Sequence, residues 1–507
     1  MLATVSSSVV QGVDGHPVSV EVHVSNGLPG YTLVGLPDAS CRESRDRVRA
    51  AILSSGLKWP ARRVTINLAP TGLRKQGASL DLPIALGILA ASGQIEPATL
   101  DRFGAIGELG LDGSVRPVAA LVSLADAVTA AELLIPSAGA EQAAVVRPGG
   151  VRAVESLAQL VAGLTEREPL PPLVEPGRCA AVGPHTRSGD LADVRGQPMA
   201  RWALEVAVAG GHHMLMIGPP GAGKTMLAGR MADLLPLLDR EQALSTTRVH
   251  SAAGLAIPGG GLVRRPPFRA PHHGASMVAI VGGGSAAMRP GEISCAHNGL
   301  LFLDELGEFS VPVLDALRQP LEEGVVRVSR AARAVTLPAR FQLVAAMNPC
   351  PCGEGGSDGM CRCSESARAR YARRLSGPLL DRFDLRVEVR PPAPAVLLGG
   401  GSEEPTAAVA ERVADARAKA AARGVLCNAL LPACRLDEVA PLSDDARDQL
   451  RRELECGGLT GRGLRRIRTL ARTIADLRGL GPVIDAPTVG AALALRATPR
   501  SVLGVPS

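Results

Sequence analysis

Aromatic side chains and lysines are scarce in this 507-residue chain. Trp, Tyr and Phe number two, two and six and make up 2% of the residues. This scarcity excludes base stacking as a main mode of nucleic-acid recognition, so we expect any nucleic-acid contact to go chiefly to phosphates. The sequence contains only four lysines, Lys58, Lys75, Lys224 and Lys419. A lysine at a fixed position of a motif is therefore informative.

The sequence also lacks long hydrophobic runs. No uninterrupted apolar stretch of about 18 residues occurs, which argues against a membrane-spanning helix. Residues 1–8 show no basic region followed by an apolar run, as a secretory signal would. We therefore expect a cytoplasmic protein with no membrane partner. In that compartment the ten cysteines are not expected to form a disulfide framework, and clustered ones are candidates for metal or redox sites.

Charge and length set further limits. The formal charge of +6 and pI near 8.9 are compatible with a nucleic-acid partner, but lie well below the basicity of a protein that coats DNA. A hydrophobic content of 46% is ample for packed cores. The length exceeds what one core supports and predicts roughly three domains.

Composition changes along the chain predict where these domains end. Short β-rich runs alternate with apolar helical stretches up to residue 165, which is typical of an α+β domain. A Pro-, Glu-, Gly- and Arg-rich stretch then reads as a linker, and a Gly-Gly-Gly-Ser run near residue 400 reads as a second one. The expected division is an N-terminal domain at 1–165, a linker at 166–192, an α/β domain at 193–395, a linker at 396–410 and a helical domain at 411–507.

The most informative motif is G-P-P-G-A-G-K-T at residues 218–225. It fits the phosphate-binding loop G-x-x-x-x-G-K-[ST] at every fixed position, between an apolar strand and a helix, and predicts ATP or GTP binding. The expected nucleotide-binding residues are Gly218, Pro219, Pro220, Gly221, Ala222, Gly223, Lys224 and Thr225. Glycines let backbone N–H groups face phosphate oxygens, the lysine reaches the terminal phosphates, and the threonine hydroxyl faces Mg²⁺.

A second apolar run, residues 299–303, ends in Asp304 and Glu305. After a phosphate loop in the same domain, this pair predicts a division of roles. We expect Asp304 to hold Mg²⁺ directly or through water, and Glu305 to act as the general base for the attacking water.

Three further polar residues complete the expected ATPase site. Asn348 follows the apolar strand 341–347 and could orient the lytic water, although such a residue alone is more often part of a turn. Arg382, in Asp-Arg-Phe-Asp, could reach the active site of a neighbouring subunit, and Arg462 could contact the nucleotide from the helical domain. Since arginine is abundant, an ordinary surface charge is the alternative for both.

The order of these motifs resembles that of the magnesium-chelatase-like AAA+ ATPases of the YifB/ComM type. The resemblance runs the full length of the chain. It is carried by G-P-P-G-A-G-K-T (218–225), P-F-R-A-P-H-H-G-A-S (267–276), P-G-E-I-S-C-A-H-N-G-L-L-F-L-D-E-L (290–306), A-A-M-N-P-C-P-C-G (345–353) and S-G-P-L-L-D-R-F-D-L (376–385).

The resemblance implies an α/β fold with an AAA+ P-loop core on a parallel sheet and a C-terminal helical lid. It also implies a homo-hexamer that uses ATP and Mg²⁺, with Asn348 as sensor 1, Arg382 as a finger acting in trans and Arg462 as sensor 2. Relatives of the ComM kind are DNA helicases that promote branch migration during uptake and integration of foreign DNA. The alternative is a chelatase-type chaperone ATPase that remodels a protein or metal-insertion partner.

Two segments are candidates for substrate contact. Residues 267–284 contain His272 and His273, which as neighbours on a strand point in opposite directions. A metal pair is therefore not expected, and pore-loop and structural roles stay equally open. Residues 325–337 alternate like a β-hairpin, with Arg327, Arg330 and Arg333 along it or at its tip. A ring of such hairpins would form a basic collar for DNA phosphates, and a solvated hairpin face is the alternative.

Four cysteines form two C-x-C pairs, Cys350 with Cys352 and Cys361 with Cys363. Thiolates on a short loop can close around a tetrahedral Zn²⁺. The C-x-C spacing is less typical of zinc sites than C-x-x-C, so zinc and free thiols are equally weighted alternatives.

The N-terminal domain resembles Lon-type protease domains through Gly77-Ala-Ser79 and G-E-L-G-L-D-G-S-V-R-P at residues 107–117. A Ser-Lys dyad would need a lysine at the position of Val122, and residues 76–223 contain no lysine. Without a general base the serine stays unactivated. Proteolysis is therefore not expected, and a scaffold or DNA-binding accessory role is.

Overall fold

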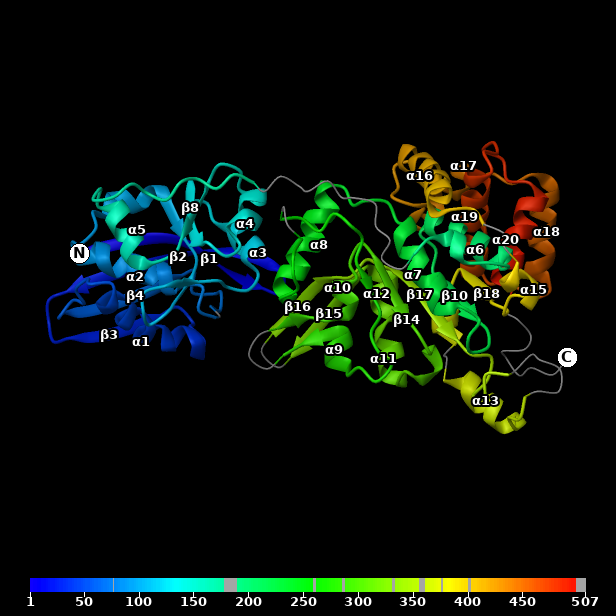
Figure 1. Ribbon diagram of the computed structural model, residues 1–507, viewed down its shortest axis with the longest axis horizontal. Helices are drawn as coiled ribbons and strands as arrows, with labels where there is room; N and C mark the ends of the chain where they lie inside the picture. The colour runs from blue at the N-terminus through cyan, green and yellow to red at the C-terminus, as the bar shows by residue number, and fades with distance from the viewer. Residues whose placement is uncertain are drawn as a thin grey trace.

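The computed structural model describes residues 1–75, 77–176, 189–258, 261–284, 288–330, 333–354, 361–374, 377–399 and 403–497. In Figure 1 the N-terminal domain occupies one end of the long axis, the domain with the phosphate loop lies in the middle, and the C-terminal helices lie at the other end. None of the described helices is both long enough and apolar enough to cross a bilayer.

The N-terminal domain is built on a seven-stranded mixed sheet with the order β3-β4-β2-β1-β5-β8-β9. β1 pairs antiparallel with β2 and β2 with β4, whereas the other neighbours are parallel. Its strands are β1 (Leu2–Gln11), β2 (Asp14–Ser25), β3 (Gly30–Val34), β4 (Arg63–Ala69), β5 (Phe103–Ala105), β8 (Glu132–Pro136) and β9 (Val151–Val154). Its helices are α1 (Ala39–Ser54), α2 (Asp81–Ala91), α3 (Leu121–Ala127), α4 (Ala140–Val146) and α5 (Leu157–Leu164).

The core of this domain follows from sequence periodicity. Alternate valines of β2, from Val18 to Val24, are buried, because successive side chains of a strand point to opposite faces. Every residue of α2 is buried, in keeping with a helix that is apolar all round. The expected strands and apolar helix of the N-terminal region are therefore confirmed as elements.

The middle domain contains a five-stranded, fully parallel sheet with the order β11-β14-β17-β10-β18. Its strands are β11 (Phe268–Arg269), β14 (Leu300–Leu303), β17 (Gln342–Met347), β10 (Met214–Ile217) and β18 (Leu385–Glu388). All residues of the three central strands are buried, as expected for a parallel sheet covered on both faces. The α/β class with a parallel sheet is thus confirmed.

The helices and short strands of this domain are α6 (Pro198–Gly210), α7 (Lys224–Leu234), α8 (Arg240–Ala253), α9 (Met277–Val281), α10 (Glu292–Cys295), η3 (Leu306–Glu308), α11 (Val311–Ala316), α12 (Arg318–Glu323), β15 (Val325–Arg330), β16 (Arg333–Pro338), α13 (Glu365–Arg373), α14 (Gly377–Leu380) and α15 (Pro394–Leu398).

The two faces of this sheet belong to different cores. Met214 and Met216 of β10 pack with C-terminal helices, whereas Leu215 and Ile217 face a second cluster that includes the β15–β16 hairpin.

The expected hairpin at residues 325–337 is present as the antiparallel pair β15–β16. Its apolar face packs against the turn between β1 and β2, where Val13 is buried in the same cluster as Val335. A Cβ on Gly12, whose φ is +69°, would lie 2.4 Å from Val335 Cγ1. The N-terminal domain therefore supports the apolar face of the hairpin.

The C-terminal region is helical and completes the core on one side of the parallel sheet. Its helices are α16 (Thr406–Ala422), α17 (Leu436–Val439), α18 (Asp444–Glu455), α19 (Gly461–Leu477) and α20 (Ala486–Arg496). α16 begins inside the stretch 396–410 that the sequence assigns to a linker. Its start is held by hydrogen bonds from the Thr406 amide to Asp190 Oδ1 (2.9 Å) and from the Leu191 amide to Thr406 Oγ1 (2.8 Å).

Candidate ATPase site

The phosphate loop, residues 218–225, joins the end of β10 to the start of α7. Gly221 and Gly223 have φ of 75° and 85°, a region that favours glycine. A Cβ on Gly218 would lie 2.0 Å from the Val389 carbonyl oxygen, so no larger residue fits there. Gln197 supports the loop from α6's N-terminal side, since its Nε2 donates to the Ala222 carbonyl at 2.7 Å.

Lys224 is buried at the first position of α7. Its Nζ donates to the carbonyls of Gly218 (2.7 Å) and Pro219 (2.9 Å) and to Asn348 Oδ1 (3.1 Å). Burial lowers the pKa of Lys224, and the carboxylates of Asp304 and Glu305 partly offset that effect. The ammonium is thus held between the loop and the end of β17, at the same edge of the sheet as the acidic pair.

The acidic pair follows β14 at the same edge of the sheet. Asp304 Oδ2 accepts a hydrogen bond from Thr225 Oγ1 at 2.7 Å, and Asp304 Oδ1 accepts the Glu305 amide at 2.9 Å. Glu305 has a φ of 52°, an uncommon backbone conformation for a non-glycine residue that often marks functional sites. The adjoining hydroxyl and carboxylate oxygens are ligands that Mg²⁺ prefers, so Thr225 and Asp304 fit this ion.

The sequence did not indicate a contact between His273 and Glu305. The structure places His273 Nδ1 2.9 Å from Glu305 Oε2, with the imidazole edge-on to Phe309 at a ring distance of 6.4 Å. The sequence left a pore-loop role and a structural role open for the histidine pair. This contact places His273 beside the expected general base. Only the P-H-H-G run signalled that this loop holds a polar site.

Asn348 lies directly after β17, where its Oδ1 meets Lys224. Its backbone hydrogen-bonds the hydroxyl of Tyr371 on α13, and burial raises the pKa of Tyr371 to about 12. A Cβ on Gly307 would lie 2.7 Å from the Tyr371 ring. Tyr371 therefore joins the segment after Asn348 to the turn that follows Glu305.

Arg382 and Arg462 lie away from the phosphate loop of their own chain. Both line a cavity of about 750 Å³ between the middle and C-terminal domains, and none of the residues 218–225 lines it. Arg382 is only 6% exposed and forms an ion pair with Glu322 on α12, whereas Arg462 at the start of α19 is exposed. Burial lowers the pKa of Arg382, and the charges of Arg466 and Arg462 add to that effect.

The segment around Arg382 is held in place by two C-terminal arginines that sequence reasoning did not single out. Arg466 Nη1 donates to the Arg382 carbonyl and to Asp384 Oδ1, both at 2.6 Å, and Arg496 Nη1 donates to the Phe383 carbonyl at 2.8 Å. Burial raises the pKa of Asp384, but the His212 imidazole, whose Nδ1 lies 3.6 Å from Asp384 Oδ2, and the Arg466 charge outweigh it and hold this pKa well below its usual range. These side chains fix the backbone that presents Arg382.

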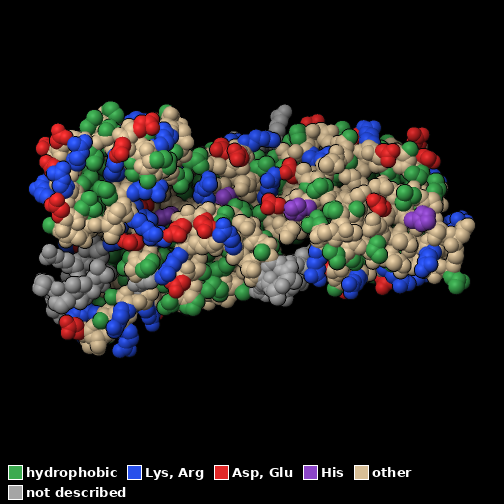
Figure 2. Space-filling model, turned by 180° about the vertical axis from the view of Figure 1, so that it is seen from behind, with side chains coloured by type: hydrophobic (Ala, Val, Ile, Leu, Met, Phe, Trp, Pro, Cys, Tyr) green, Lys and Arg blue, Asp and Glu red, His purple; other side chains and the backbone are tan. Residues whose placement is uncertain are grey.

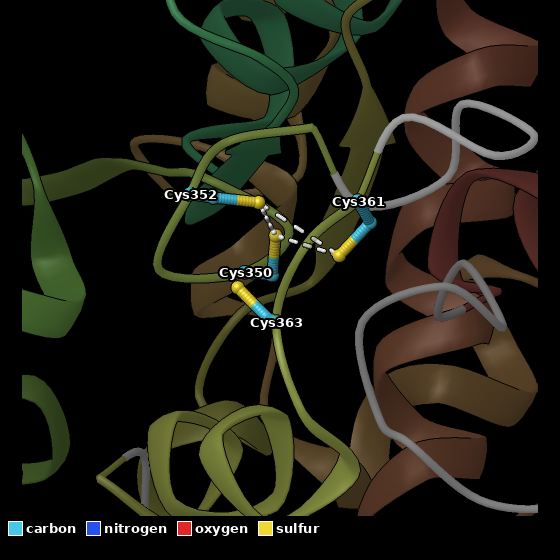
Figure 3. A group of neighbouring side chains, drawn as sticks. All are labelled: Cys350, Cys352, Cys361 and Cys363. Atoms are coloured by element: carbon cyan, nitrogen blue, oxygen red, sulfur yellow. Dashed lines mark hydrogen bonds between the residues drawn. The ribbon is translucent and has the colours of Figure 1, made fainter.

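The four cysteines of the two C-x-C pairs come together in space (Figure 3), and their sulfur atoms all lie within 4.8 Å of one another. The Sγ of Cys350 is 3.2 Å from that of Cys352 and 3.7 Å from that of Cys361. Hydrogen bonds from the Glu354 backbone and from Cys350 lower the pKa of Cys352 to about 6. The group has the residue types and spacing that can hold a metal ion.

The remaining candidates lie outside this site. Arg327 on β15 is exposed and pairs with Glu323 at 2.8 Å, while the side chains of Arg330 and Arg333 lie outside the described part of the structure. In the N-terminal domain Ser79 and Val122 are buried, with exposures of 6% and 0%. Lys75, four residues before Ser79, is buried and donates to the Pro70 carbonyl.

Comparison with known proteins gives three family matches that together span most of the chain. "Magnesium chelatase, subunit ChlI" matches residues 190–397, "Subunit ChlI of Mg-chelatase" matches residues 20–138, and "Magnesium chelatase, subunit ChlI C-terminal" matches residues 403–496. The middle match contains the phosphate loop, the acidic pair, Asn348, the cysteine group and Arg382.

Individual relatives agree with these matches. Competence protein ComM of Haemophilus influenzae is 44% identical over 506 residues, covering 98% of both chains. The uncharacterized protein YifB of Salmonella typhimurium is 42% identical over 512 residues, covering 99% of this chain and 98% of its own. The magnesium-chelatase 38 kDa subunit of Cereibacter sphaeroides is 29% identical over 212 residues, or 39% of this chain and 55% of its own. The chain therefore belongs to the YifB/ComM family of magnesium-chelatase-like AAA+ ATPases.

Proposed function

We propose that this chain is an ATP-driven motor that acts on DNA, as a helicase or branch-migration factor in recombination or in the uptake of foreign DNA. One observation carries the ATPase part of the proposal. Lys224, Thr225, Asp304 and Asn348 meet through hydrogen bonds of 2.7 to 3.1 Å at one edge of the parallel sheet. Glu305 lies beside them.

These groups divide the work of hydrolysis among themselves. The loop N–H groups and Lys224 bind and orient the phosphates of ATP. Thr225 and Asp304 would hold Mg²⁺, which when bound neutralises charge that develops on the phosphate oxygens. Glu305 accepts the proton of the attacking water, and His273 at 2.9 Å holds that carboxylate in position. Asn348 orients the water from the opposite side.

Arg382 and Arg462 support an oligomeric motor. Because they line a cavity that none of the residues 218–225 lines, we assign them to the nucleotide site of a neighbouring subunit. A closed ring provides each subunit with one such neighbour, and a hexamer is the ring that we propose. Arg382 would leave Glu322 on assembly and meet the γ-phosphate, where an arginine finger stabilises the transition state.

DNA is the partner that the relatives favour. The face in Figure 2 has Lys and Arg interspersed with Asp and Glu rather than gathered in one basic field. We therefore assign DNA contact to short segments of the chain, each of which a ring of subunits would repeat. Arg327, Arg330 and Arg333 of the β15–β16 hairpin are our candidates, and the relative named a competence protein favours the same partner.

We expect branched or single-stranded DNA to stimulate ATP turnover. We also expect Arg330→Ala/Arg333→Ala to weaken DNA binding while basal turnover stays unchanged. The slope of the logarithm of the binding constant against the logarithm of salt concentration should become shallower by roughly two per subunit engaged. The matched control is Arg447→Ala/Arg451→Ala, because these exposed arginines lie on α18, remote from the hairpin in sequence. Binding measured by fluorescence anisotropy over a salt series tests this, and identical slopes in all three proteins would exclude the hairpin.

A chelatase-type chaperone ATPase is the second candidate. The similarity to the magnesium-chelatase 38 kDa subunit, 29% identical over 212 residues, favours it. A chaperone of this kind would hydrolyse ATP at a rate that DNA does not change and that a protein partner raises. ATP turnover with and without duplex, single-stranded and branched DNA separates the two functions.

A further inference from the structure

We propose that Cys350, Cys352, Cys361 and Cys363 bind one Zn²⁺ ion, and that this ion holds the segment after Asn348 in the position that ATP hydrolysis needs. The metal site stands on its own geometry. The second half, which concerns turnover, rests on the proposed ATPase function.

The sulfur positions suit tetrahedral zinc. With Zn–S bonds of about 2.3 Å, the sulfurs of a regular tetrahedron lie about 3.8 Å apart. The Cys350–Cys361 and Cys352–Cys361 separations are 3.7 and 3.8 Å, and the Cys350–Cys352 separation is 3.2 Å. In Figure 3 the sulfurs of Cys350, Cys352 and Cys361 face one another, and the side chain of Cys363 lies beside them. The sulfur of Cys363 lies within 4.8 Å of the other three, so small shifts of the four side chains would bring them to the tetrahedral separation.

All four ligands are thiols, which indicates a structural rather than a catalytic ion. A closed Cys₄ set leaves no open position for water or substrate. Soft thiolate ligands select zinc over Mg²⁺, so this site would not compete with the magnesium site at Thr225 and Asp304. The cysteines lie within one connected segment of chain, between β17 and α13.

The position of the group in the fold shows what the ion would stabilise. Cys350 is two residues beyond Asn348, and Cys363 is two residues before α13 begins at Glu365. Zinc would therefore join the end of β17 to the start of α13. The expected effect is a more rigid connection between these two elements.

This connection touches the ATPase site on two sides. A Cβ on Gly353 would lie 2.6 Å from Pro220 Cδ, so the cysteine segment packs directly on the phosphate loop. On the other side, Arg374 Nη1 donates to the Gly307 carbonyl at 2.8 Å, and Tyr371 contacts both Gly307 and the Asn348 backbone. The cysteine group thus lies between the phosphate loop and the turn after Glu305.

Elemental analysis of the purified protein tests the metal site directly. We expect one zinc per chain in wild type and in Cys434→Ser, a matched control because Cys434 is an exposed cysteine outside the group. We expect near-complete loss of zinc in Cys352→Ser and Cys361→Ser. Replacement of zinc by Co²⁺ should give the visible ligand-field bands of tetrahedral cobalt thiolate. Wild type that holds no zinc and takes up none from added Zn²⁺, or that holds iron instead, would overturn the assignment.

The second half is tested by hydrogen exchange without nucleotide, and then by turnover. Removing zinc from wild type by a chelator, or by Cys352→Ser, should speed amide exchange in residues 348–354 and 361–374, with exchange in the N-terminal sheet unchanged. ATP turnover should fall about tenfold or more, the size seen when supporting contacts of a site are lost, and return when zinc is restored to wild type. Zinc loss with unchanged exchange would refute the bracing role. Absence of turnover in zinc-loaded wild type would instead refute the ATPase proposal.

Discussion

Replacing Arg382 by alanine is expected to lower ATP turnover by about 10³- to 10⁵-fold, because an arginine finger stabilises charge on the transferring phosphoryl group only in the transition state. ATP binding should change little, since Arg382 lines a cavity apart from the phosphate loop of its own chain. Arg382→Lys should not restore turnover, because an ammonium cannot reproduce the planar guanidinium. Steady-state turnover and ATP affinity measured on the same preparations check both parts.

Mixed assemblies decide whether Arg382 acts between subunits. Lys224→Ala subunits lack the phosphate contact but retain Arg382, whereas Arg382→Ala subunits have the reverse. If the finger acts in trans, mixing the two inactive proteins should restore a fraction of wild-type turnover. Arg390→Ala is the matched control, because Arg390 is a nearby arginine with a 78% exposed side chain that pairs only with Glu388 in the described structure. Mixed proteins that stay inactive, together with a lowered melting temperature of Arg382→Ala, would show that Arg382 is structural.

Replacing Glu305 by glutamine is expected to lower turnover by about 10²- to 10⁴-fold, the usual contribution of a general base. The amide keeps the size of the side chain but cannot accept the proton of the attacking water. ATP should still bind, because Lys224, Thr225 and Asp304 are unchanged. The protein should therefore accumulate with ATP bound, which can be measured as nucleotide retained after gel filtration.

His273 supplies the control for this prediction. Its Nδ1 lies 2.9 Å from Glu305 Oε2, so His273→Gln should reduce turnover less than Glu305→Gln does. A His273 variant with the same loss as Glu305→Gln would move the base role away from Glu305.

The elements around the site could be predicted because their signals are local. The strand Met214–Ile217, the glycine-rich turn and the helix that starts at Lys224 follow from apolar runs and from one motif. The parallel sheet was predictable for the same reason, since its central strands read as continuous apolar segments. The proximity of Asp304 to Thr225 followed from the two motifs, since both residues were expected to face the same Mg²⁺.

Contacts between distant segments could not be read from the sequence. Arg466 and Arg496 hold the backbone near Arg382 from helices more than 80 residues away, and a chain this rich in arginine gives no sign of which ones are buried. The start of α16 was expected near residue 411 because Gly and Ser precede it. The helix begins at Thr406 because Asp190, 216 residues earlier in the chain, accepts a hydrogen bond from its first amide.

The cysteine group falls between these two cases. The C-x-C spacing marked Cys350, Cys352, Cys361 and Cys363 as a possible set, but spacing alone could not distinguish a converged site from separate thiols. The structure brings their sulfurs within 4.8 Å of one another. It also adds contacts to Pro220 and Gly307 that no local pattern encodes.

The central claim is that ATP is bound and hydrolysed at Lys224 in the presence of Mg²⁺. The most direct test compares Mg²⁺-dependent ATP turnover by wild type with that by Lys224→Ala, at the same protein concentration and with folding checked by circular dichroism. We expect measurable turnover by wild type, loss of it on removal of Mg²⁺, and a fall of about 10²- to 10³-fold in the variant, the usual effect of losing one charged contact to the transition state. Turnover by Lys224→Ala equal to that of wild type would contradict the account.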